Sequence, residues 1–401
     1  MVSQFELKTS LLLLAGLFVF GTAAAAEIDP AAPAIDFGGF SLYPGLGLAE
    51  KSDSNILRLN DADPNKKSSR ITILSPSVDM RAKQSGNEYS LDYGADIGRY
   101  SNSSIDNYID QRLLGLVNLG LSTRSTLNIQ PEYKIGHDDR GTTYGGFTAM
   151  TEPNTWRSSG LKGSFAYGAE EARGQAVFDL GYNNRQYQNN RTVTTAYDRK
   201  LTKIGGTFYL RVQPKTQLLV NAKHTGISYA DSASLLSGNE LSLMVGVKWE
   251  ASAQTSGEVR AGQLRKSFDT TYPTYTGGSW EGNVRWTPVT YINVDALTSR
   301  QPVETTLTGS SAIMVSNSGA NVGYDLNEQL TMNVNGYQMK EDFVGAGRND
   351  TTKIFGLKAE YKFRSWLVGA AELTNSKKTS SDPLNDYKRN IFMLSLRTVL
   401  N

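Results

Sequence analysis

The sequence contains no cysteine and only two histidines, His137 and His224, in 401 residues. Thiol chemistry is therefore excluded, and few residues remain that could hold a transition metal. Neither sign of charge dominates, because 41 lysines and arginines oppose 39 aspartates and glutamates, for a net charge of +2. A chain with so small a net charge has no overall field to attract nucleic acid. We expect no cofactor, no metal site and no nucleic-acid partner.

Long apolar stretches are also scarce. Only 39% of the residues are hydrophobic and the mean hydropathy is −0.38, whereas each membrane-spanning helix needs about 20 nearly uninterrupted apolar residues. A polytopic helical membrane protein is therefore excluded. The chain has instead 38 glycines and 20 tyrosines, together with abundant serine, threonine and asparagine. This composition favours one large β structure.

The one long apolar run lies at the N-terminus. A lysine precedes the run at 11–20, and four consecutive alanines follow it. A basic start, a short apolar run and an Ala-x-Ala site are typical of a secretory signal peptide, whereas an uncleaved helix would need a longer run to span a membrane. We therefore interpret 1–26 as a signal peptide cleaved near Ala25 or Ala26. Residues 27–40 show no periodicity, and we expect them to form a flexible lead-in on the periplasmic side.

From residue 41 onward, apolar and polar residues alternate over segments of ten or more. In 88–98, for example, Tyr89, Leu91 and Tyr93 share one face and polar residues or glycines fill most of the other. Such alternation is typical of strands with one apolar and one polar face. About eighteen segments of this kind recur, centred near residues 48, 77, 93, 115, 131, 162, 180, 207, 222, 245, 261, 284, 296, 319, 334, 358, 371 and 395.

The connections between these segments alternate in length. Turns of a few residues interleave with longer polar connections at 57–69, 100–106, 137–154, 186–198, 268–277, 301–310, 342–351 and 375–387. Tight turns on one side and longer loops on the other are the plan of outer-membrane barrels. The sequence therefore predicts an all-β fold, a transmembrane antiparallel up-and-down β-barrel of about 18 strands, over residues 41–401. A soluble β-sandwich also alternates, but its strands are usually only about five or six residues long.

Aromatic residues favour the same fold. Seven of them lie on the apolar face within a few residues of a short turn, where they would form an interfacial girdle on the periplasmic side. They are Tyr89, Tyr167, Trp249, Trp286, Tyr324, Tyr361 and Phe363.

The polar face carries charges of both signs. If the apolar face contacts lipid, this face lines a lumen, which must be wet because so many ionised groups need water or partners. Neighbouring opposite charges cancel within a Debye length, so we expect no strong selectivity for anions or cations. An alternative for any single residue is that it only solvates the wall or pairs across strands. The candidate pore-lining residues are Asp92, Asp96, Arg112, Glu132, Lys134, Lys162, Asp179, Arg211, Lys248, Glu250, Arg285, Glu360 and Arg397.

Four aromatic residues fall on the polar face by the same alternation: Trp156, Tyr187, Tyr209 and Tyr337. An aromatic ring can stack on the face of a sugar while its polar edge keeps a hydrogen bond. We therefore take these four as candidate sugar-stacking residues, with the alternative that they fill space and brace loops.

No catalytic constellation is found in the sequence. A hydrolase would need a nucleophile, a base and an orienting acid close together. His137 lies where we expect an outer loop to begin, and no serine can be placed beside it from sequence. His224 shares a face with Leu218 and Val220, which favours an interfacial position. We predict that the protein is not an enzyme and assign no catalytic residue.

Several stretches resemble the putative β-barrel porin type 2 family. Residues 43–55 (YPGLGLAEKSDSN) are similar to the first strand of that family and the turn after it, and further similar stretches are 92–94, 98–100, 136–141, 151–153 and 386–394. The resemblance covers nearly the whole mature chain. It departs at the end, where Val399, Leu400 and Asn401 stand in place of the aromatic residue that commonly closes such barrels and is read by the insertion machinery.

This resemblance implies a barrel in the bacterial outer membrane, of a kind often associated with exopolysaccharide synthesis and export. The partners it implies are outer-membrane lipid, a secreted polysaccharide, a periplasmic polysaccharide export protein and an inner-membrane synthesis complex. An alternative is a general or nutrient-uptake diffusion porin. A membrane-embedded enzyme is a third possibility, which the missing catalytic constellation disfavours.

Overall fold

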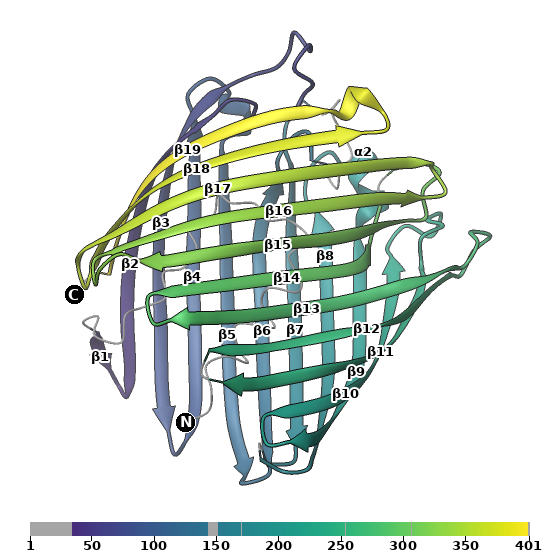
Figure 1. Cartoon of the computed structure of the whole chain (residues 1–401). Coiled ribbons are helices and arrows are strands. Elements are labelled where there is room, and N and C mark those ends of the chain that lie inside the picture. The colour runs from purple at the N-terminus through teal and green to yellow at the C-terminus, as the bar shows by residue number, and fades with distance from the viewer. Residues whose placement is uncertain (1–33, 143–150, 170, 253, 306, 400–401) are drawn as a thin grey trace.

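The computed structural model describes residues 34–142, 151–169, 171–252, 254–305 and 307–399. Its strands wind round one central space and close into a barrel (Figure 1). Each of eighteen long strands pairs antiparallel with the next in sequence, and β19 pairs with β2 to close the ring. The strands are β2 (Phe40–Asp53), β3 (Ser69–Gln84), β4 (Asn87–Tyr100), β5 (Tyr108–Ser122), β6 (Ser125–Asp138), β7 (Asn154–Tyr167), β8 (Gly174–Tyr187), β9 (Arg199–Gln213), β10 (Thr216–Tyr229), β11 (Gly238–Ser252), β12 (Thr255–Phe268), β13 (Tyr275–Val289), β14 (Ile292–Val303), β15 (Ala312–Asp325), β16 (Leu330–Val344), β17 (Arg348–Arg364), β18 (Leu367–Ser380) and β19 (Tyr387–Val399).

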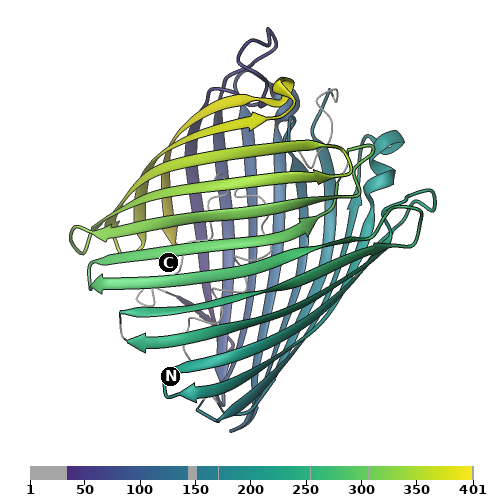
Figure 2. The same ribbon diagram turned by 45° about the vertical axis from the view of Figure 1, so that its right-hand side comes forward.

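The predicted fold class is confirmed. Every strand centre expected from the sequence falls inside one of the eighteen strands. The strands run from 12 to 17 residues, which is long enough to cross a bilayer when tilted. Figure 2 shows the near and far walls of the barrel crossing at a steep angle, as tilted strands in a closed barrel must.

The connections divide the barrel into two ends. The turns after the odd-numbered strands β3 to β17 are short and lie at one end, called here the short-turn end, where β2 also begins and β19 finishes. Most connections at the other, long-loop end are longer. Outer-membrane barrels keep short turns in the periplasm and long loops outside the cell.

Helical structure in the described residues is confined to the long-loop end. It consists of single turns at η1 (Ser104–Asp106), α2 (Arg191–Thr194), η2 (Thr195–Tyr197) and η3 (Pro383–Asn385). Within the described ranges, no helix has the length and apolar character needed to span a membrane.

Two expectations about connections are corrected. The long loop expected at 342–351 is a turn of only three residues, 345–347, because Gly345 and Gly347 take positive φ angles of 90° and 65° and let the chain reverse tightly. The lead-in expected at 27–40 is described only from residue 34. There, β1 (Ile35–Phe37) folds back on the start of β2 and pairs with it, so this part of the lead-in is ordered.

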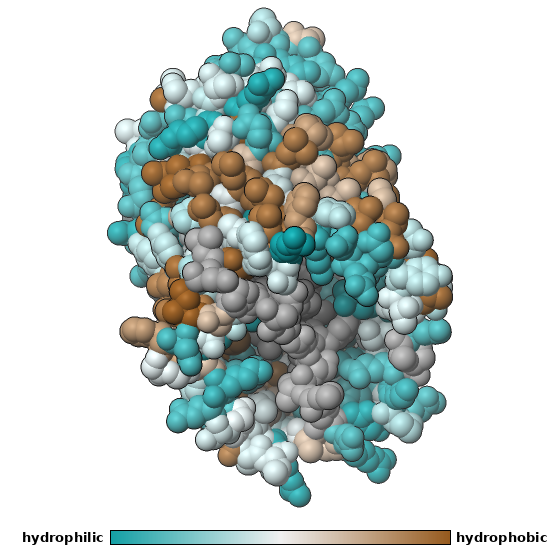
Figure 3. Space-filling model, turned by 90° about the vertical axis from the view of Figure 1, so that its left-hand side faces the viewer, coloured by the Kyte–Doolittle hydropathy of each residue, from teal (hydrophilic) through white to brown (hydrophobic). Residues whose placement is uncertain are grey.

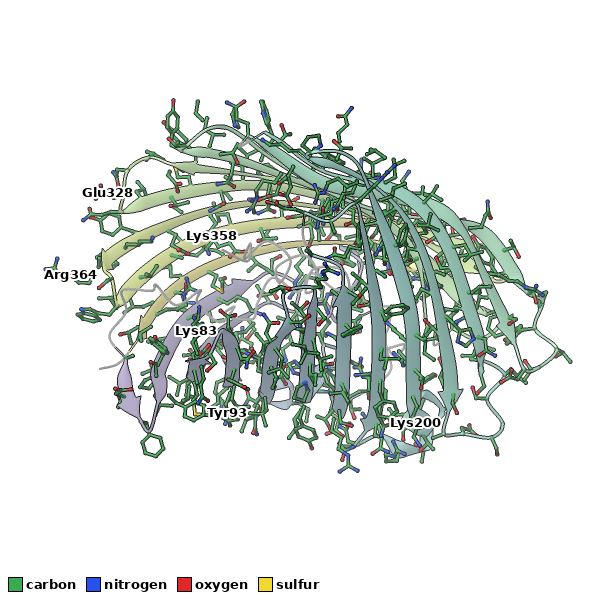
Figure 4. The ribbon with its side chains drawn as sticks, turned by 90° about the horizontal axis from the view of Figure 1, so that it is seen from below. Lys83, Tyr93, Lys200, Glu328, Lys358 and Arg364 are labelled. Atoms are coloured by element: carbon green, nitrogen blue, oxygen red, sulfur yellow. The ribbon has the colours of Figure 1, made fainter. Side chains whose placement is uncertain are left out.

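Side chains alternate between the two faces of the barrel wall. Leu180 and Val245 are 62% and 64% exposed on the outer face, where outer-membrane barrels contact lipid. Figure 3 shows apolar side chains gathered in a band across this side of the molecule, with hydrophilic side chains above and below. In Figure 4, Tyr93 lies on the outside and Lys358 on the inner side of the wall.

The seven residues of the expected girdle all occupy outer-face positions near the short-turn end. Tyr167, Trp286 and Phe363 are the most exposed of them. Tyr361 and Phe363 contact each other edge to face with ring centroids 4.9 Å apart, and Tyr324 does the same with Tyr291 at 5.9 Å. The structure thus places an aromatic row where a membrane interface would cross the barrel.

Candidate functional site

The inner wall of the barrel is polar and largely ion-paired. Some pairs join neighbouring or next-but-one strands: Arg112 Nε lies 3.2 Å from Asp92 Oδ1, Arg285 Nε 2.6 Å from Asp295 Oδ1, and Arg397 Nη2 3.3 Å from Glu360 Oε2. Others lie within one strand, where Lys134 Nζ is 3.1 Å from Glu132 Oε2 and Lys358 Nζ is 2.8 Å from Glu360 Oε2. These pairs are partly exposed, so each contributes little to stability. Their effect on the lumen is to neutralise charge locally while keeping the wall hydrophilic.

The remaining candidate pore-lining residues also occupy inner-face positions. Lys162 Nζ lies 3.7 Å from Glu132 Oε2, Arg211 Nη1 donates to the carbonyl of Pro214 at 2.6 Å, and Lys248 Nζ lies 5.6 Å from the ring centroid of Tyr209. Asp179 and Glu250 are exposed.

Asp96 behaves differently from the other candidates. It is only 5% exposed and accepts a hydrogen bond of 2.5 Å from Ser75 Oγ. It therefore braces the wall between β3 and β4 rather than presenting a carboxylate to the lumen.

Tyr209 and Tyr337 have inner-face positions and are partly exposed. The hydroxyl of Tyr209 donates to Glu258 Oε2 at 3.4 Å, across two intervening strands. The ring of Tyr337 lies directly over Gly319 on β15, where a Cβ atom would come within 2.0 Å of it. Glycine at 319 is therefore required for this ring position.

Trp156 and Tyr187 are brought together at the long-loop end by Asp138. The indole Nε1 of Trp156 donates to Asp138 Oδ1 at 3.0 Å, and the Tyr187 hydroxyl donates to Oδ2 at 2.9 Å. The guanidinium of Arg185 lies 4.1 Å from the Trp156 ring centroid and also pairs with Asp138 at 2.6 Å. Because Tyr187 is only 6% exposed, its ring braces this cluster, whereas Trp156 keeps part of its surface accessible.

The loop between β2 and β3 folds onto the inner wall at the long-loop end. Ile56 is buried against Ala49, Ile71 and Ile73, three inner-face positions that are apolar on an otherwise polar wall. Arg58 then reaches the residue that follows β6, where its Nη2 lies 2.8 Å from Asp139 Oδ2. This loop is therefore held at the mouth of the barrel by an apolar seat on one side and an ion pair on the other.

The loop between β14 and β15 is held in a similar way. Leu307 packs on a second apolar cluster of the inner wall, formed by Ile313, Val315 and Phe343. Glu304 at the start of the loop accepts a hydrogen bond of 2.7 Å from Lys266 Nζ on β12 and one of 2.5 Å from the hydroxyl of Tyr229 on β10. Two loops thus converge on the mouth from different parts of the ring.

The two histidines lie on opposite faces. His137 is the second-last residue of β6 and so does not lie in the loop where the sequence placed it. Its ring stacks on the ring of Tyr108, with centroids 4.3 Å apart. Its Nδ1 lies 2.9 Å from Asp110 Oδ1 and its Nε2 3.2 Å from Asp139 Oδ1, so both ring nitrogens face carboxylates. His224 is exposed on the outer face beside Leu218 and Val220, as the sequence indicated. Within the described residues, no group of three or more histidine, aspartate or glutamate side chains could hold a metal ion.

Sequence reasoning missed the buried ion pairs that hold the mouth. Lys266 is 1% exposed between Glu240 and Glu304, Arg389 Nη2 lies 2.5 Å from Asp53 Oδ2, and Lys378 Nζ lies 2.6 Å from Asp350 Oδ2. Alternation shows that these residues point inward. It does not show which inward charges meet, because partners come from strands or loops far apart in sequence.

Comparison with known proteins agrees with this architecture. Residues 29–399 match the model of a family described as putative beta-barrel porin 2, which confirms the resemblance drawn from the sequence. No curated protein matches the chain in sequence.

Solved outer-membrane structures resemble the barrel at low sequence identity. OpdQ of Pseudomonas aeruginosa superposes with a TM-score of 0.50 at 11% identity, covering 91% of this chain and all of that one. The FrpB iron transporter of Neisseria meningitidis gives 0.47 at 12% identity, and the match covers 88% of this chain but only 64% of FrpB. A bacterial polysaccharide outer membrane secretin gives 0.39 at 8% identity, covering 91% and 100%. These likenesses concern the fold alone. With its family match and its closed eighteen-stranded ring, the chain belongs to the putative beta-barrel porin 2 family and is an outer-membrane β-barrel with the architecture of a porin-like channel.

Proposed function

We propose that the barrel is the outer-membrane conduit for a secreted exopolysaccharide. The observation that carries the proposal is the inner wall, where charged side chains from many strands mostly pair with one another. A polysaccharide has to stay hydrated while it crosses the membrane, because its hydroxyl groups cannot be desolvated without hydrogen-bond partners. A hydrophilic wall whose charges are already paired solvates such a chain without holding any repeat unit tightly.

The inner-face aromatic residues support the same function. Trp156, Tyr209 and Tyr337 keep accessible surface on the inner wall, and aromatic rings offer weak, repeated contacts for sugar faces. Contacts of this kind guide a sugar polymer and release it. The resemblance to a family associated with exopolysaccharide systems adds to this argument.

Directional export needs an energy source that this chain does not supply, since the sequence contains no phosphate-binding loop. The barrel therefore works with a periplasmic polysaccharide export protein and an inner-membrane synthesis complex. The cleaved signal peptide, 1–26, brings the chain to the periplasm for insertion.

The test is deletion of the gene, with the wild-type gene returned on a plasmid as the control. We expect the deletion strain to lose surface polysaccharide and to retain polymer in the periplasm or stop its synthesis, while growth on single carbon sources is unchanged. Normal surface polymer together with lost growth on one carbon source would overturn the proposal. That result would make the barrel an uptake porin.

A further inference from the structure

The charges on the inner wall are not spread evenly round the ring. The inner-face positions of β7 to β10 carry six cationic side chains and one carboxylate. The cations are Lys162, Arg185, Arg199, Lys203, Arg211 and Lys223, and the carboxylate is Asp179. We call these four inner faces the cationic strip. The two signs are nearly balanced on the adjoining strands β11 to β14, which present five carboxylates, Glu240, Glu250, Glu258, Glu281 and Asp295, against four cations, Lys248, Arg260, Lys266 and Arg285.

Strand register brings the cations of the strip side by side. Arg185 on β8 is directly opposite Arg199 on β9. Two inner-face rows further toward the short-turn end, Lys162 and Lys203 both pair with Gly181, which lies between them and has no side chain. Adjacent strands lie about 4.8 Å apart, so the backbones of Lys162 and Lys203 stand roughly 10 Å from each other. The side chain of Lys203 lies over Gly181, where an added Cβ atom would be 3.3 Å from Lys203 Cβ.

The nearby carboxylates are shared and do not neutralise the strip. Glu132 on β6 forms an ion pair with Lys162 at 3.7 Å but lies closer to Lys134, at 3.1 Å. Glu281 on β13 forms an ion pair with Lys223 at 3.6 Å, but its contact with Arg260 is shorter.

Ion pairing differs from one cation of the strip to the next. Arg185 has its own partner, Asp138. Among the described residues, Lys203 makes no ion pair within 4 Å. The strip therefore keeps an excess of positive charge that faces the lumen.

We propose that the cationic strip is an anion path and that the exported polymer is an acidic polysaccharide, an inference that rests on the export function proposed above. A polymer carrying carboxylate or similar groups is attracted to the strip and exchanges contacts from one cation to the next. The carboxylates on β11 to β14 begin beside the strip, since β11 pairs with β10. They do not cancel this attraction, because most are bound by cations of these same four strands: Glu281 by Arg260, Glu240 by Lys266 and Asp295 by Arg285. The expectation of no strong charge selectivity rests on opposite charges being neighbours, whereas the strip groups six cations with one carboxylate.

The test uses the purified barrel in planar lipid bilayers under a KCl gradient, where the reversal potential reports the ratio of chloride to potassium permeability. We expect this ratio to exceed 1. In the variant Lys162→Gln/Lys203→Gln it should fall toward 1 by about twofold or more. The matched control, Arg285→Gln/Lys358→Gln, removes two inner-face cations outside the strip and should shift the ratio less. A variant of opposite sign, Asp179→Asn, removes the one carboxylate of the strip and should raise the ratio.

Polymer block gives a second readout. Polygalacturonate, an acidic polysaccharide, should block the wild-type current at lower concentration than neutral dextran of similar length, and Lys162→Gln/Lys203→Gln should reduce that difference. A ratio at or below 1 in the wild type, or equal block by the two polymers, would overturn the anion path.

The two proposals fail separately. If the purified barrel is anion-selective but the deletion strain still exports its polymer, the export function is overturned and the anion path is not. Loss of a surface polymer that proves to be uncharged would support export and overturn the acidic substrate.

Discussion

The ammonium group of Lys266 lies 2.7 Å from a carboxylate oxygen of Glu304, although β12 and the loop after β14 are separated by the whole of β13. Lys266 is 1% exposed, and its second partner is Glu240 at 2.8 Å. A cation buried so completely is tolerated only when its partners are in place. The pair therefore fastens the start of the β14–β15 loop across the inner wall.

Removing this cation should be costly. Lys266→Met leaves two carboxylates close together without their partner, and we expect the free energy of unfolding to fall by about 3–5 kcal/mol. The free energy of unfolding is measured by urea unfolding of the barrel in detergent, monitored by tryptophan fluorescence. The control is Arg285→Met, which breaks a half-exposed inner-wall pair and should cost at most about 1 kcal/mol. Equal costs for the two variants would show that the Lys266 pair has no special structural role.

The packing of Ile56 in the β2–β3 loop on the inner wall should control the width of the pore at the long-loop end. Ile56→Ala removes most of the side chain that packs on Ile71 and Ile73, so the loop should leave the wall more often and single-channel conductance should rise. Leu384→Ala is the control, because Leu384 is 84% exposed in another outer loop and should leave conductance unchanged. A conductance that does not differ between wild type and Ile56→Ala would mean that this loop does not narrow the path.

The two faces of β8 offer a direct test of which side meets lipid. Leu180 is 62% exposed on the outer face and Asp179 is exposed on the inner face next to it. Leu180→Arg should cost roughly 2–4 kcal/mol if the position lies near the bilayer midplane, whereas Asp179→Arg should cost much less because water solvates it. Refolding titrations into phospholipid vesicles compare the two variants. A larger cost for Asp179→Arg would invert the assignment of faces.

Acid should weaken the contact between the β2–β3 loop and Asp139, the residue that follows β6. Burial by itself would raise the pKa of Asp139, but Arg58 and the hydrogen bond from His137 hold that pKa well below its ordinary value. Because the folded-state pKa is lower than that of the unfolded chain, the stabilisation is complete above about pH 4 and is lost as pH falls through the folded-state value.

Unfolding midpoints measured between pH 7 and pH 2 test this. The variant Asp139→Asn should be less stable at pH 7 and should lose less stability on acidification than the wild type. Glu328→Gln, at an exposed position in a short turn, should follow the wild-type curve. Parallel curves for wild type and Asp139→Asn would contradict the role of this carboxylate.

Local patterns in the sequence determined the fold. Strands such as 88–98 alternate apolar and polar residues with period two, and each strand of a barrel needs only its own alternation and two neighbours to find its place. The number of strands, their order in the barrel and the face to which each side chain points can therefore be predicted from the sequence. The turn at 345–347 was misread because the polar residues around it look like a loop, while two glycines with positive φ make it tight.

The tertiary structure decided what the inward charges do. Alternation assigned Asp96, Lys162 and Arg285 alike to the inner wall, yet Asp96 is buried against Ser75, Arg285 is paired with Asp295, and Lys162 shares a carboxylate with Lys134. The same limit applies to Lys266 and Glu304, and to the gathering of cations on β7 to β10. Electrostatic interaction depends on the distance between groups, and closure of the ring sets distances between residues that the sequence keeps far apart.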